Sequence, residues 1–445
     1  MNLTAKVLVG MGLGLFVGLT INLTDMNAAG SFINEYLVDG LFHIVGTLFI
    51  NSLKMLVVPL VLFSLICGVC GIGDIKLLGR IGTKSFALYM LTTAVAIATA
   101  IAIAASLGIG KGMNAPTDSV FSAREAPPLS QVLIDIIPTN PIQAMASGEM
   151  LSIIFFAMLV GISILLVGKK AKGLVETVEL MNEVMMKMVG VIMSLAPYAV
   201  FCLLARAMAN LGMDLLFALG WYVSVVIGAL FFHLFITLQG TLVIFSGLSP
   251  VKFLKKMRNA QVFAFSTSSS NATIPVTLRT VTNRLGVNNS VASFTVPFGA
   301  TINMDGTAIM QGVATVFIAN VYGVELGISG YLTVILMSVL ASVGTAGVPG
   351  VGLIMLSMVF SQVGLPMEGI GLILGVDRIL DMIRTSVNVT GDAVVSTIVA
   401  KSEGKFNEDV FNDPDAGLFD DENTHIDKEA ELQLAETVSA AQQKE

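Results

Sequence analysis

Long runs of apolar residues, separated by short polar connections, fill most of the chain up to about residue 400. A run of about 20 apolar residues is long enough to cross the hydrocarbon core of a bilayer as a helix. The pattern therefore predicts an all-α polytopic membrane protein with eight transmembrane helices. The predicted spans cover residues 5–23, 41–71, 84–109, 150–168, 176–210, 215–247, 289–321 and 368–400.

Two further apolar stretches, 251–285 and 329–365, are interrupted near their middles by Ser, Gly and Pro. The interruption reads TSSSNATIPVT at 267–277 in the first and SVGTAGVPGVG at 342–352 in the second. The roughly 15 residues on either side of each break are too few for a full crossing. We therefore predict two re-entrant helical hairpins, since open backbone at membrane depth is tolerated only where protein or a wet cavity satisfies it.

Each predicted hairpin is followed by a span with similar polar interruptions, FGATINMDGT at 298–307 and SVNVTGD at 386–392. One hairpin enters from each side of the membrane, so the two hairpin-plus-span units have opposite orientations. Corresponding breaks in such inverted repeats are typical of the midplane binding site of a secondary transporter.

Composition supports the membrane assignment. The chain is 55% hydrophobic and only 12% charged, whereas soluble domains carry about twice that charged fraction. The net charge of −7 arises from residues 403–445, which hold 13 acidic and 3 basic side chains, while residues 1–402 hold 18 acidic and 21 basic. We expect residues 403–445 to form an acidic, disordered tail, and residues 410–445 to be dispensable for function.

The basic residues fall on alternate connections between the spans. One connection holds Lys76 and Arg80, a second holds 169–172, and a third holds 252–258. The positive-inside bias then places both termini in the cytoplasm. Lys6 precedes the first apolar run without a small-residue cleavage site, which indicates a first span rather than a signal peptide.

The last span carries an unusual density of charge in the stretch VDRILDMIRTSVNVTGD, 376–392. At about 100° per residue its polar side chains share one helix face, which should point into the protein because intramembrane charges normally do. The residues of this polar stripe are Asp377, Asp381, Arg384, Thr385, Asn388 and Asp392.

Within the polar stripe, Arg384 offers a planar fork that suits a carboxylate. Asp381, nearly one turn earlier, can accept hydrogen bonds from an ammonium group. This pair predicts a receptor for an amino acid with an acidic side chain, whose backbone carboxylate could bind the hydroxyls and free N–H groups of the SSSN tip. The alternative is that the stripe only pairs with itself, Asp381 with Arg384.

The predicted span interiors hold more acids than bases. Uncompensated buried charges would cost several kcal/mol each, so bound cations are expected. The available ligands are hard oxygen donors, which favours sodium over a transition metal, with protonation of one carboxylate as the alternative. The acids are Asp305, Asp377, Asp381 and Asp392, and the bases are Arg378 and Arg384.

Enzymatic chemistry is not indicated. The histidines, His43, His233 and His425, have no partner spacing, and Cys67 and Cys70 lie in an apolar run. Neither a nucleophile with a base nor a metal cage can be assembled from them. We expect no enzymatic activity, no organic cofactor and no nucleic-acid partner.

Four motifs, TSSSNATIPVT, TINMDGTA, SVGTAGVPGVG and ILDMIRTSVNVTGD, together resemble the dicarboxylate/amino acid:cation symporter family. This family includes bacterial and archaeal glutamate/aspartate transporters and the animal excitatory amino acid transporters. The resemblance covers about 400 residues. It implies a sodium-coupled symporter that imports glutamate or aspartate by alternating access in the cell (inner) membrane. A proton-coupled glutamate symporter, a C4-dicarboxylate symporter and a substrate-gated anion channel remain alternatives.

The resemblance also implies a homotrimer with two kinds of domain. Residues 1–247 would contain spans 1–6, of which spans 1, 2, 4 and 5 form the trimerisation scaffold while spans 3 and 6 join the transport domain. Residues 248–402 would form the core of that transport domain, with the first hairpin, span 7, the second hairpin and span 8.

The family's ligands can be carried onto this chain position by position. The implied substrate-binding residues are Ser269, Ser270, Thr307, Val348, Gly352, Asp381, Arg384, Thr385 and Asn388. Two to three sodium ions are implied. The first would use Gly299, Asn303, Asn388 and Asp392; the second Thr301, Ser342, Val343 and Thr345 with Met304 nearby; the third Tyr89, Thr92, Thr93, Asn303 and Asp305.

The chain departs from the family pattern in one charged position. Archaeal relatives carry an arginine at the position of Ser268 and animal relatives carry it at that of Met382, whereas this chain has Arg378 instead. Whether Arg378 replaces the missing arginine is a question for the structure. Asn271 also stands where a serine or smaller residue is common, which could alter the substrate fit.

Overall fold

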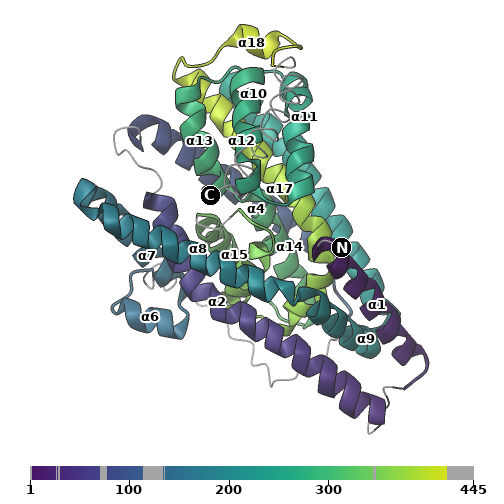
Figure 1. Ribbon diagram of the computed structural model, residues 1–445. Helices are drawn as coiled ribbons and strands as arrows, with labels where there is room; N and C mark the ends of the chain where they lie inside the picture. The colour runs from purple at the N-terminus through teal and green to yellow at the C-terminus, as the bar shows by residue number, and fades with distance from the viewer. Residues whose placement is uncertain are drawn as a thin grey trace, which may run out of the picture.

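The computed structural model describes residues 3–26, 28, 31–70, 78–113, 134, 136–343 and 347–417 (Figure 1). Almost all of these residues are helical, and an isolated bridge between Val287 and Phe406 is the only β pairing among them. Several helices are long and strongly apolar. The all-α class of a polytopic membrane protein is therefore confirmed.

The helices of the N-terminal half follow the predicted apolar runs closely up to α7. They are α1 (Leu3–Leu23), η1 (Ile33–Phe42), α2 (His43–Cys70), η2 (Leu78–Gly82), α4 (Thr83–Leu107), α6 (Pro141–Ser147), α7 (Met150–Val167), η3 (Gly168–Ala171), α8 (Lys172–Ser194), α9 (Ala196–Phe232), η4 (His233–Thr237) and α10 (Leu238–Ser246).

The predicted fifth span, 176–210, is wrong as a single helix. Helix α8 ends at Ser194 and α9 begins at Ala196, with Pro197 in its first turn, where a missing N–H is tolerated. Helix α9 is itself divided at Gly212, whose φ of 60° and ψ of −144° are non-helical. The apolar profile continues unchanged between Ser194 and Ala196 and does not show that break, whereas the break at Gly212 falls in the predicted connection between the fifth and sixth spans, 211–214.

The C-terminal half contains shorter helices and one long one. They are α11 (Pro250–Thr267), α12 (Ser270–Arg279), η5 (Thr280–Arg284), α13 (Asn289–Ile302), α14 (Asp305–Val321), α15 (Gly327–Ser342), α16 (Val351–Val363), α17 (Glu368–Ser402) and α18 (Glu408–Asn412). The two interrupted stretches thus fold as the pairs α11–α12 and α15–α16, and the members of each pair contact one another.

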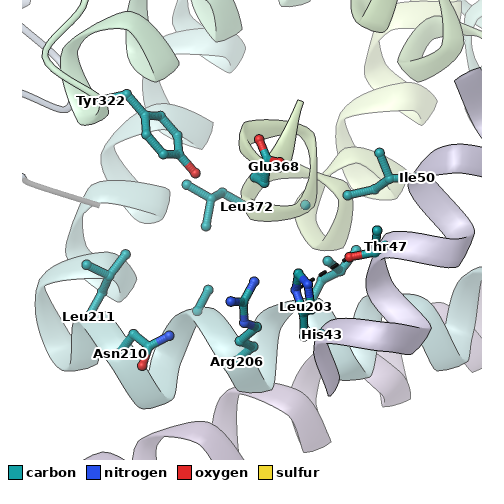
Figure 2. A pocket seen from close by; sticks show the side chains of 12 residues that line it. His43, Thr47, Ile50, Leu203, Arg206, Asn210, Leu211, Tyr322, Glu368 and Leu372 are labelled. Carbon is teal, nitrogen blue, oxygen red and sulfur yellow. Dashed lines mark hydrogen bonds between the residues drawn. The ribbon is translucent and has the colours of Figure 1, made fainter. Parts of the chain in front are cut away.

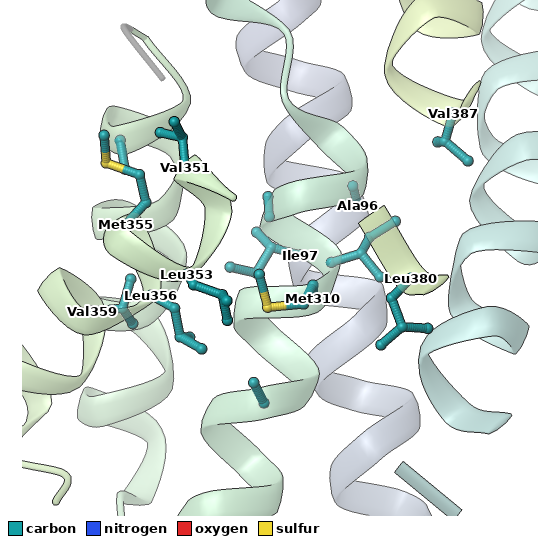
Figure 3. Packing of buried hydrophobic residues seen from close by; sticks show 14 of the residues in the cluster. Ala96, Ile97, Met310, Val351, Leu353, Met355, Leu356, Val359, Leu380 and Val387 are labelled. Carbon is teal, nitrogen blue, oxygen red and sulfur yellow. The ribbon is translucent and has the colours of Figure 1, made fainter. Parts of the chain in front are cut away.

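Helix α17 runs through the centre of this half and contacts α9, α10, α11, α13 and α14. Its buried apolar residues join one large core, which also includes α4 and α16. Figure 3 shows part of this core, with Ile97 of α4, Met310 of α14 and Leu380 of α17 among its members. The polar stripe of α17 is therefore enclosed by other helices rather than exposed to lipid.

Helix α1 packs along the first part of α9. Glycines at every fourth position of α1, among them Gly14 and Gly18, lie against the backbone of α9. A Cβ on Gly14 would come within 2.7 Å of the carbonyl oxygen of Phe201, so only glycine permits this close approach. Small residues at this spacing are a common basis of helix contact within membranes.

The prediction of disorder beyond residue 402 is wrong for residues 403–417. This segment contains α18 and lies at one end of the molecule, over α10 to α13 (Figure 1). The amide of Asn407 donates to the carbonyl of Gly286 at 2.7 Å, and Phe411 is 1% exposed. The rest of the predicted tail, 418–445, lies outside the described residues.

A buried lysine fixes this C-terminal segment to the first helix pair. The Lys256 ammonium donates to the carbonyl oxygens of Arg284, Val410 and Asp413, each at 2.7 Å. Three backbone acceptors satisfy all three N–H donors of the ammonium, which is why this lysine can be 4% exposed. The segment is part of the fold, although its acidic composition is typical of a solvated tail.

Candidate functional site

The connections within the two helix pairs meet in the interior. Between α11 and α12, Ser269 caps α12 by accepting from the amide of Ala272 at 3.2 Å. Its hydroxyl donates to the carbonyl of Gly347, in the α15–α16 connection, at 2.7 Å, and the amide of Asn271 donates to the same carbonyl at 3.1 Å. The two interruptions predicted from sequence are therefore in direct contact.

Serines of the first connection are buried rather than displayed to solvent, with Ser270 4% exposed. Gly347 is needed on the opposite side, because a Cβ there would lie 2.9 Å from the carbonyl oxygen of Ala300. Val348 is half-buried beside it and packs against the core. Ser269, Ser270 and Val348 thus lie at one junction.

The polar stripe of α17 is buried along its whole length, as its helical periodicity predicts. Arg384 is 0% exposed, and its guanidinium donates to Asp377 at 2.6 Å and to Asp381 at 2.8 Å. The Thr385 hydroxyl donates to the carbonyl of Asp381 at 2.8 Å. Arg384 therefore pairs within its own helix, and Asp377, whose role the sequence left open, is its second carboxylate.

Gly352 of α16 faces the Arg384 guanidinium, and Thr307 of α14 lies beside Gly352. A Cβ on Gly352 would lie 3.4 Å from Arg384 Nη2 and 3.3 Å from the Thr307 methyl group. The Nε atom of Arg384 is buried and has no hydrogen-bond partner among the described residues. The side chain thus lies where α14, α16 and α17 converge, with one donor unused.

Arg378 reaches the same group of acids. Its Nη1 atom lies 3.4 Å from Asp381 Oδ2, while Arg384 holds the other oxygen of that carboxylate. Asp381 therefore contacts two arginines from its own helix. Asp377, the second carboxylate of this group, pairs with Arg384 at 2.6 Å.

The break between α13 and α14 brings amides onto α17. Asn303 leaves the helical region with φ −92° and ψ 91°, and its side-chain N–H donates to the carbonyl of Asn388 at 3.1 Å and to Asp392 at 2.9 Å. The amide of Gly306 donates to the Asn388 side-chain oxygen at 2.7 Å. Gly299 lies at the same point, since a Cβ there would approach Asp392 Oδ1 at 2.5 Å.

This cluster fits a small hard cation. Asp392 is 1% exposed, and no basic side chain of the described residues forms an ion pair with it. The side-chain oxygen of Asn303 is buried without a hydrogen-bond partner. A buried carboxylate beside an unsatisfied amide oxygen calls for either a cation or a proton.

A second polar cluster surrounds Asp305, which is 0% exposed. Its carboxylate accepts from the Thr93 hydroxyl at 2.6 Å, and the Thr92 hydroxyl lies 3.5 Å away. The other oxygen of Asp305 lies 2.9 Å from Nε2 of His233. The Tyr89 hydroxyl instead donates to the carbonyl of Thr295 at 2.9 Å.

His233 is the residue of this site that sequence reasoning missed. It lies 72 positions from Asp305, is 2% exposed, and occurs in the apolar run of the predicted sixth span. A polar side chain within such a run was the available signal. Only the fold could identify its partner, because no helical spacing connects the two residues.

Fewer contacts join the residues of the implied second ion site. The Thr301 hydroxyl donates to the carbonyl of Phe298 at 2.9 Å, and Ser342 and Val343 end α15. Met304 lies close to Asn388, whose side-chain N–H is 3.4 Å from its sulfur. Thr345 lies outside the described residues, and no hydrogen bond joins Thr301 to Ser342 or Val343 in the described part of the chain.

Comparison with known proteins gives a match over nearly the whole chain. A family model described as the sodium:dicarboxylate symporter family matches residues 3–402. The chain is 32% identical over 410 residues to the proton/sodium-glutamate symport protein of Geobacillus stearothermophilus, covering 90% of this chain and 96% of that protein.

Two further relatives show the range of names in this group. The chain is 34% identical to the proton/glutamate-aspartate symporter of Escherichia coli K12, with 91% of this chain and 94% of that protein covered. It is 30% identical to the C4-dicarboxylate transport protein of Bacillus subtilis 168, with 92% and 95% covered.

Proposed function

Because the chain belongs to the sodium:dicarboxylate symporter family, we propose that it is a secondary active symporter that imports glutamate or aspartate together with sodium ions by alternating access. The observation that carries this proposal is the wholly buried Arg384 guanidinium, placed where α14, α16 and α17 converge. A buried guanidinium fork is suited to a carboxylate ligand.

Substrate recognition would proceed by exchange of partners at Arg384. The side-chain carboxylate of the amino acid takes guanidinium donors, including the unused Nε, while Asp381 accepts from the substrate ammonium. Arg378 and Asp377 keep the acids of the stripe compensated during this exchange. The substrate's backbone carboxylate binds at the Ser269–Ser270 end of α12, where N–H groups and hydroxyls converge.

Sodium is a co-transported substrate in this proposal. The Asp392 cluster and the Asp305 cluster each contain a buried carboxylate among oxygen donors, and Thr301 with the end of α15 supplies carbonyls for a further ion. Two to three ions are proposed. A sodium ion bound beside one of these carboxylates neutralises its buried charge. Binding of the ion is therefore coupled to ordering of the residues around it.

The architecture would be eight spans with two re-entrant hairpins in inverted repeats. Helices α11 and α16 have 18 and 13 residues; at 1.5 Å per residue they extend about 27 and 20 Å, short of the roughly 30 Å core. Five longer segments of the described residues are apolar enough to span by themselves. Residues 248–402 would form the core of the moving domain, and both termini would be cytoplasmic.

A homotrimer in the cell inner membrane completes the proposal, with spans 1, 2, 4 and 5 as its scaffold. Its support is an apolar groove between α2 and α8, lined by Met55, Leu180, Val184 and Val191, all exposed in the single chain. Exposed apolar surface of this kind is expected where protein meets lipid or another copy.

Proton coupling is the second candidate. Relatives named as proton symporters support it, and a proton on a buried carboxylate would remove the same charge as sodium does. Import of C4-dicarboxylates is supported by one relative's name, but it would leave Asp381 facing a second carboxylate. Substrate-gated anion conduction is a further alternative without a specific contact in its favour.

Uptake of labelled aspartate into proteoliposomes, with sodium and proton gradients imposed separately, tests the proposal. Accumulation driven by sodium alone supports it, and accumulation driven only by protons would replace it with the second candidate. Uptake that never exceeds equilibrium would indicate a channel.

A further inference from the structure

The Asp305 carboxylate is buried without a permanent positive charge beside it. It is 0% exposed, and no lysine or arginine of the described residues forms an ion pair with it. Its Oδ1 atom accepts from the Thr93 hydroxyl at 2.6 Å, and its Oδ2 atom lies 2.9 Å from Nε2 of His233. Because an ionised carboxylate only accepts hydrogen bonds, the Nε2 atom carries the hydrogen and donates it.

The His233 ring makes its one polar contact among the described residues with Asp305. Its Nδ1 atom is buried without a hydrogen-bond partner in that part of the chain, and the side chain is 2% exposed. Burying a ring with one unsatisfied nitrogen is costly, and an apolar side chain would fill the same space without that cost. What the histidine contributes beyond packing is therefore the N–H group directed at Asp305.

The backbone around His233 departs from the regular α-helix. His233 begins η4, a π-helical turn between α9 and α10. Such turns are rare, and they occur frequently at functional sites. The η4 turn contacts both α4, which carries Thr93, and α17. His233, Thr93 and Asp305 thus come from three segments that the proposed function assigns to one moving domain, so their geometry is kept while that domain moves.

A histidine differs in one respect from a lysine or an arginine at this place. It supplies a hydrogen bond to the carboxylate without a permanent positive charge, so the negative charge of Asp305 is left for a mobile cation. A carboxylate can accept at about four lone-pair positions, so the bonds from Thr93 and His233 do not fill it. Carboxylates that bind metal ions are commonly held in this way by hydrogen bonds from residues outside the ligand set.

We propose that His233 is a positioning residue for the sodium ion that binds at Asp305. Its Nε2–H group fixes the plane of the carboxylate, so that an oxygen lone pair is directed toward the ion. His233 acts through Asp305 and does not touch the ion, and it lies outside the ligand set that the family resemblance implies. The inference rests on the proposed function, in which sodium is co-transported.

Thermal unfolding of the purified full-length protein in detergent, with sodium chloride replacing choline chloride, tests binding without reference to transport. An ion that binds the native state raises Tm by mass action, so the sodium concentration that gives a fixed rise reports the affinity. His233→Leu should raise that concentration about tenfold, the lower end of the range for losing such an outer hydrogen bond. An unchanged concentration would overturn the proposal.

Two further variants separate the N–H group from the shape of the ring. His233→Gln keeps an N–H donor and should restore most of the sodium affinity, whereas His233→Phe keeps a ring without the donor and should behave as His233→Leu does. The matched control is His43→Leu, because His43 lies on α2 with its ring facing Thr47 (Figure 2); its sodium affinity should equal that of the wild type. Wild-type affinity in His233→Phe, or no rescue by His233→Gln, would overturn the proposal.

A double-mutant cycle tests whether His233 acts through Asp305. Once Asp305→Asn has removed the charge of the carboxylate, its orientation no longer matters to the ion. In that background His233→Leu should change the remaining sodium affinity by less than about twofold, whereas the effects of independent residues add. A full tenfold loss in the Asp305→Asn background would show that His233 acts elsewhere, and it would overturn the proposal.

Uptake into proteoliposomes separates this inference from the proposed function. His233→Leu should raise the sodium concentration for half-maximal aspartate uptake about tenfold, while Vmax and the KM for aspartate at saturating sodium stay at their wild-type values. A lower Vmax with an unchanged sodium dependence would indicate a structural role and overturn the proposal. If the wild-type protein binds sodium but imports no aspartate, the proposed function fails while the unfolding assay still decides the role of His233.

Discussion

Replacing Asp392 with asparagine removes one negative charge from the cluster at the α13–α14 break and changes little else. The side chain is 1% exposed, and it accepts a hydrogen bond from the Asn303 side-chain N–H at 2.9 Å. Asparagine keeps an oxygen at the same position, so this hydrogen bond is retained. The substitution therefore tests the charge and not the packing.

The size of the effect follows from the contact that is lost. A hydrogen bond or close contact to a charged group contributes about 1.5–3 kcal/mol. Since about 1.4 kcal/mol corresponds to a factor of ten, and Asp392→Asn keeps a neutral oxygen ligand, we expect a loss of at least about 1 kcal/mol. The sodium concentration at half-maximal transport should rise by about fivefold or more.

The assay is a sodium titration of aspartate uptake in proteoliposomes, with choline replacing sodium at constant ionic strength. Asp25→Asn is the matched control, because it removes an exposed acid from the connection after α1. Thermal unfolding of both variants in detergent checks that they fold. A folded Asp392→Asn protein with the wild-type sodium midpoint would refute the assignment of this carboxylate to a sodium site.

Three other perturbations have definite expected outcomes. Arg384→Cys should abolish aspartate uptake and admit neutral amino acids instead; unchanged aspartate affinity in competition assays would contradict the substrate assignment. A chain ending at Gly417 should transport normally, whereas one ending at Gly404 should lose stability in a thermal-unfolding assay, because it lacks the contacts to the first helix pair; equal stability would disprove their role. Hydrogen bonds from Lys84 and Arg80 lower the pKa of Glu403, so its stabilising effect is present above the ordinary glutamate pKa and is lost as pH falls through the lowered value. Glu403→Gln should flatten the acid limb of a stability–pH profile, and an unchanged profile would exclude this linkage.

Much of the candidate site could be predicted from local sequence patterns. Helical periodicity placed Asp377, Arg384 and Asp392 on one face of a single helix, and the structure buries that face. The polar interruptions at 267–277 and 342–352 marked the two connections that meet at Gly347. These features depend on residues close in sequence, where spacing determines geometry.

Other features depend on contacts between distant segments. His233 meets Asp305 across 72 residues, and Lys256 meets Asp413 across 157. Composition gave a wrong prediction for residues 403–417, because an acidic, polar sequence is typical of disorder. The buried lysine and the Val287–Phe406 bridge stabilise that segment through partners that its own sequence does not reveal.

Helix boundaries inside apolar runs are a third feature that is hard to predict from sequence. The ends of α8 and α9 at Ser194 and Ala196 lie within uniformly apolar sequence. Hydropathy measures only whether a segment tolerates lipid, and not where its backbone turns. Pro197 was the available signal, but a proline near a helix start and one inside a kinked helix look alike in sequence.

The central claim is that Arg384 and the acids around it bind an acidic amino acid while sodium neutralises the remaining buried carboxylates. Accumulation of labelled aspartate in proteoliposomes, under an inward sodium gradient with pH equal on both sides, measures this most directly. The account predicts uptake above equilibrium that collapses when the sodium gradient is dissipated. Folded, reconstituted protein that accumulates neither aspartate nor glutamate under that gradient would contradict it.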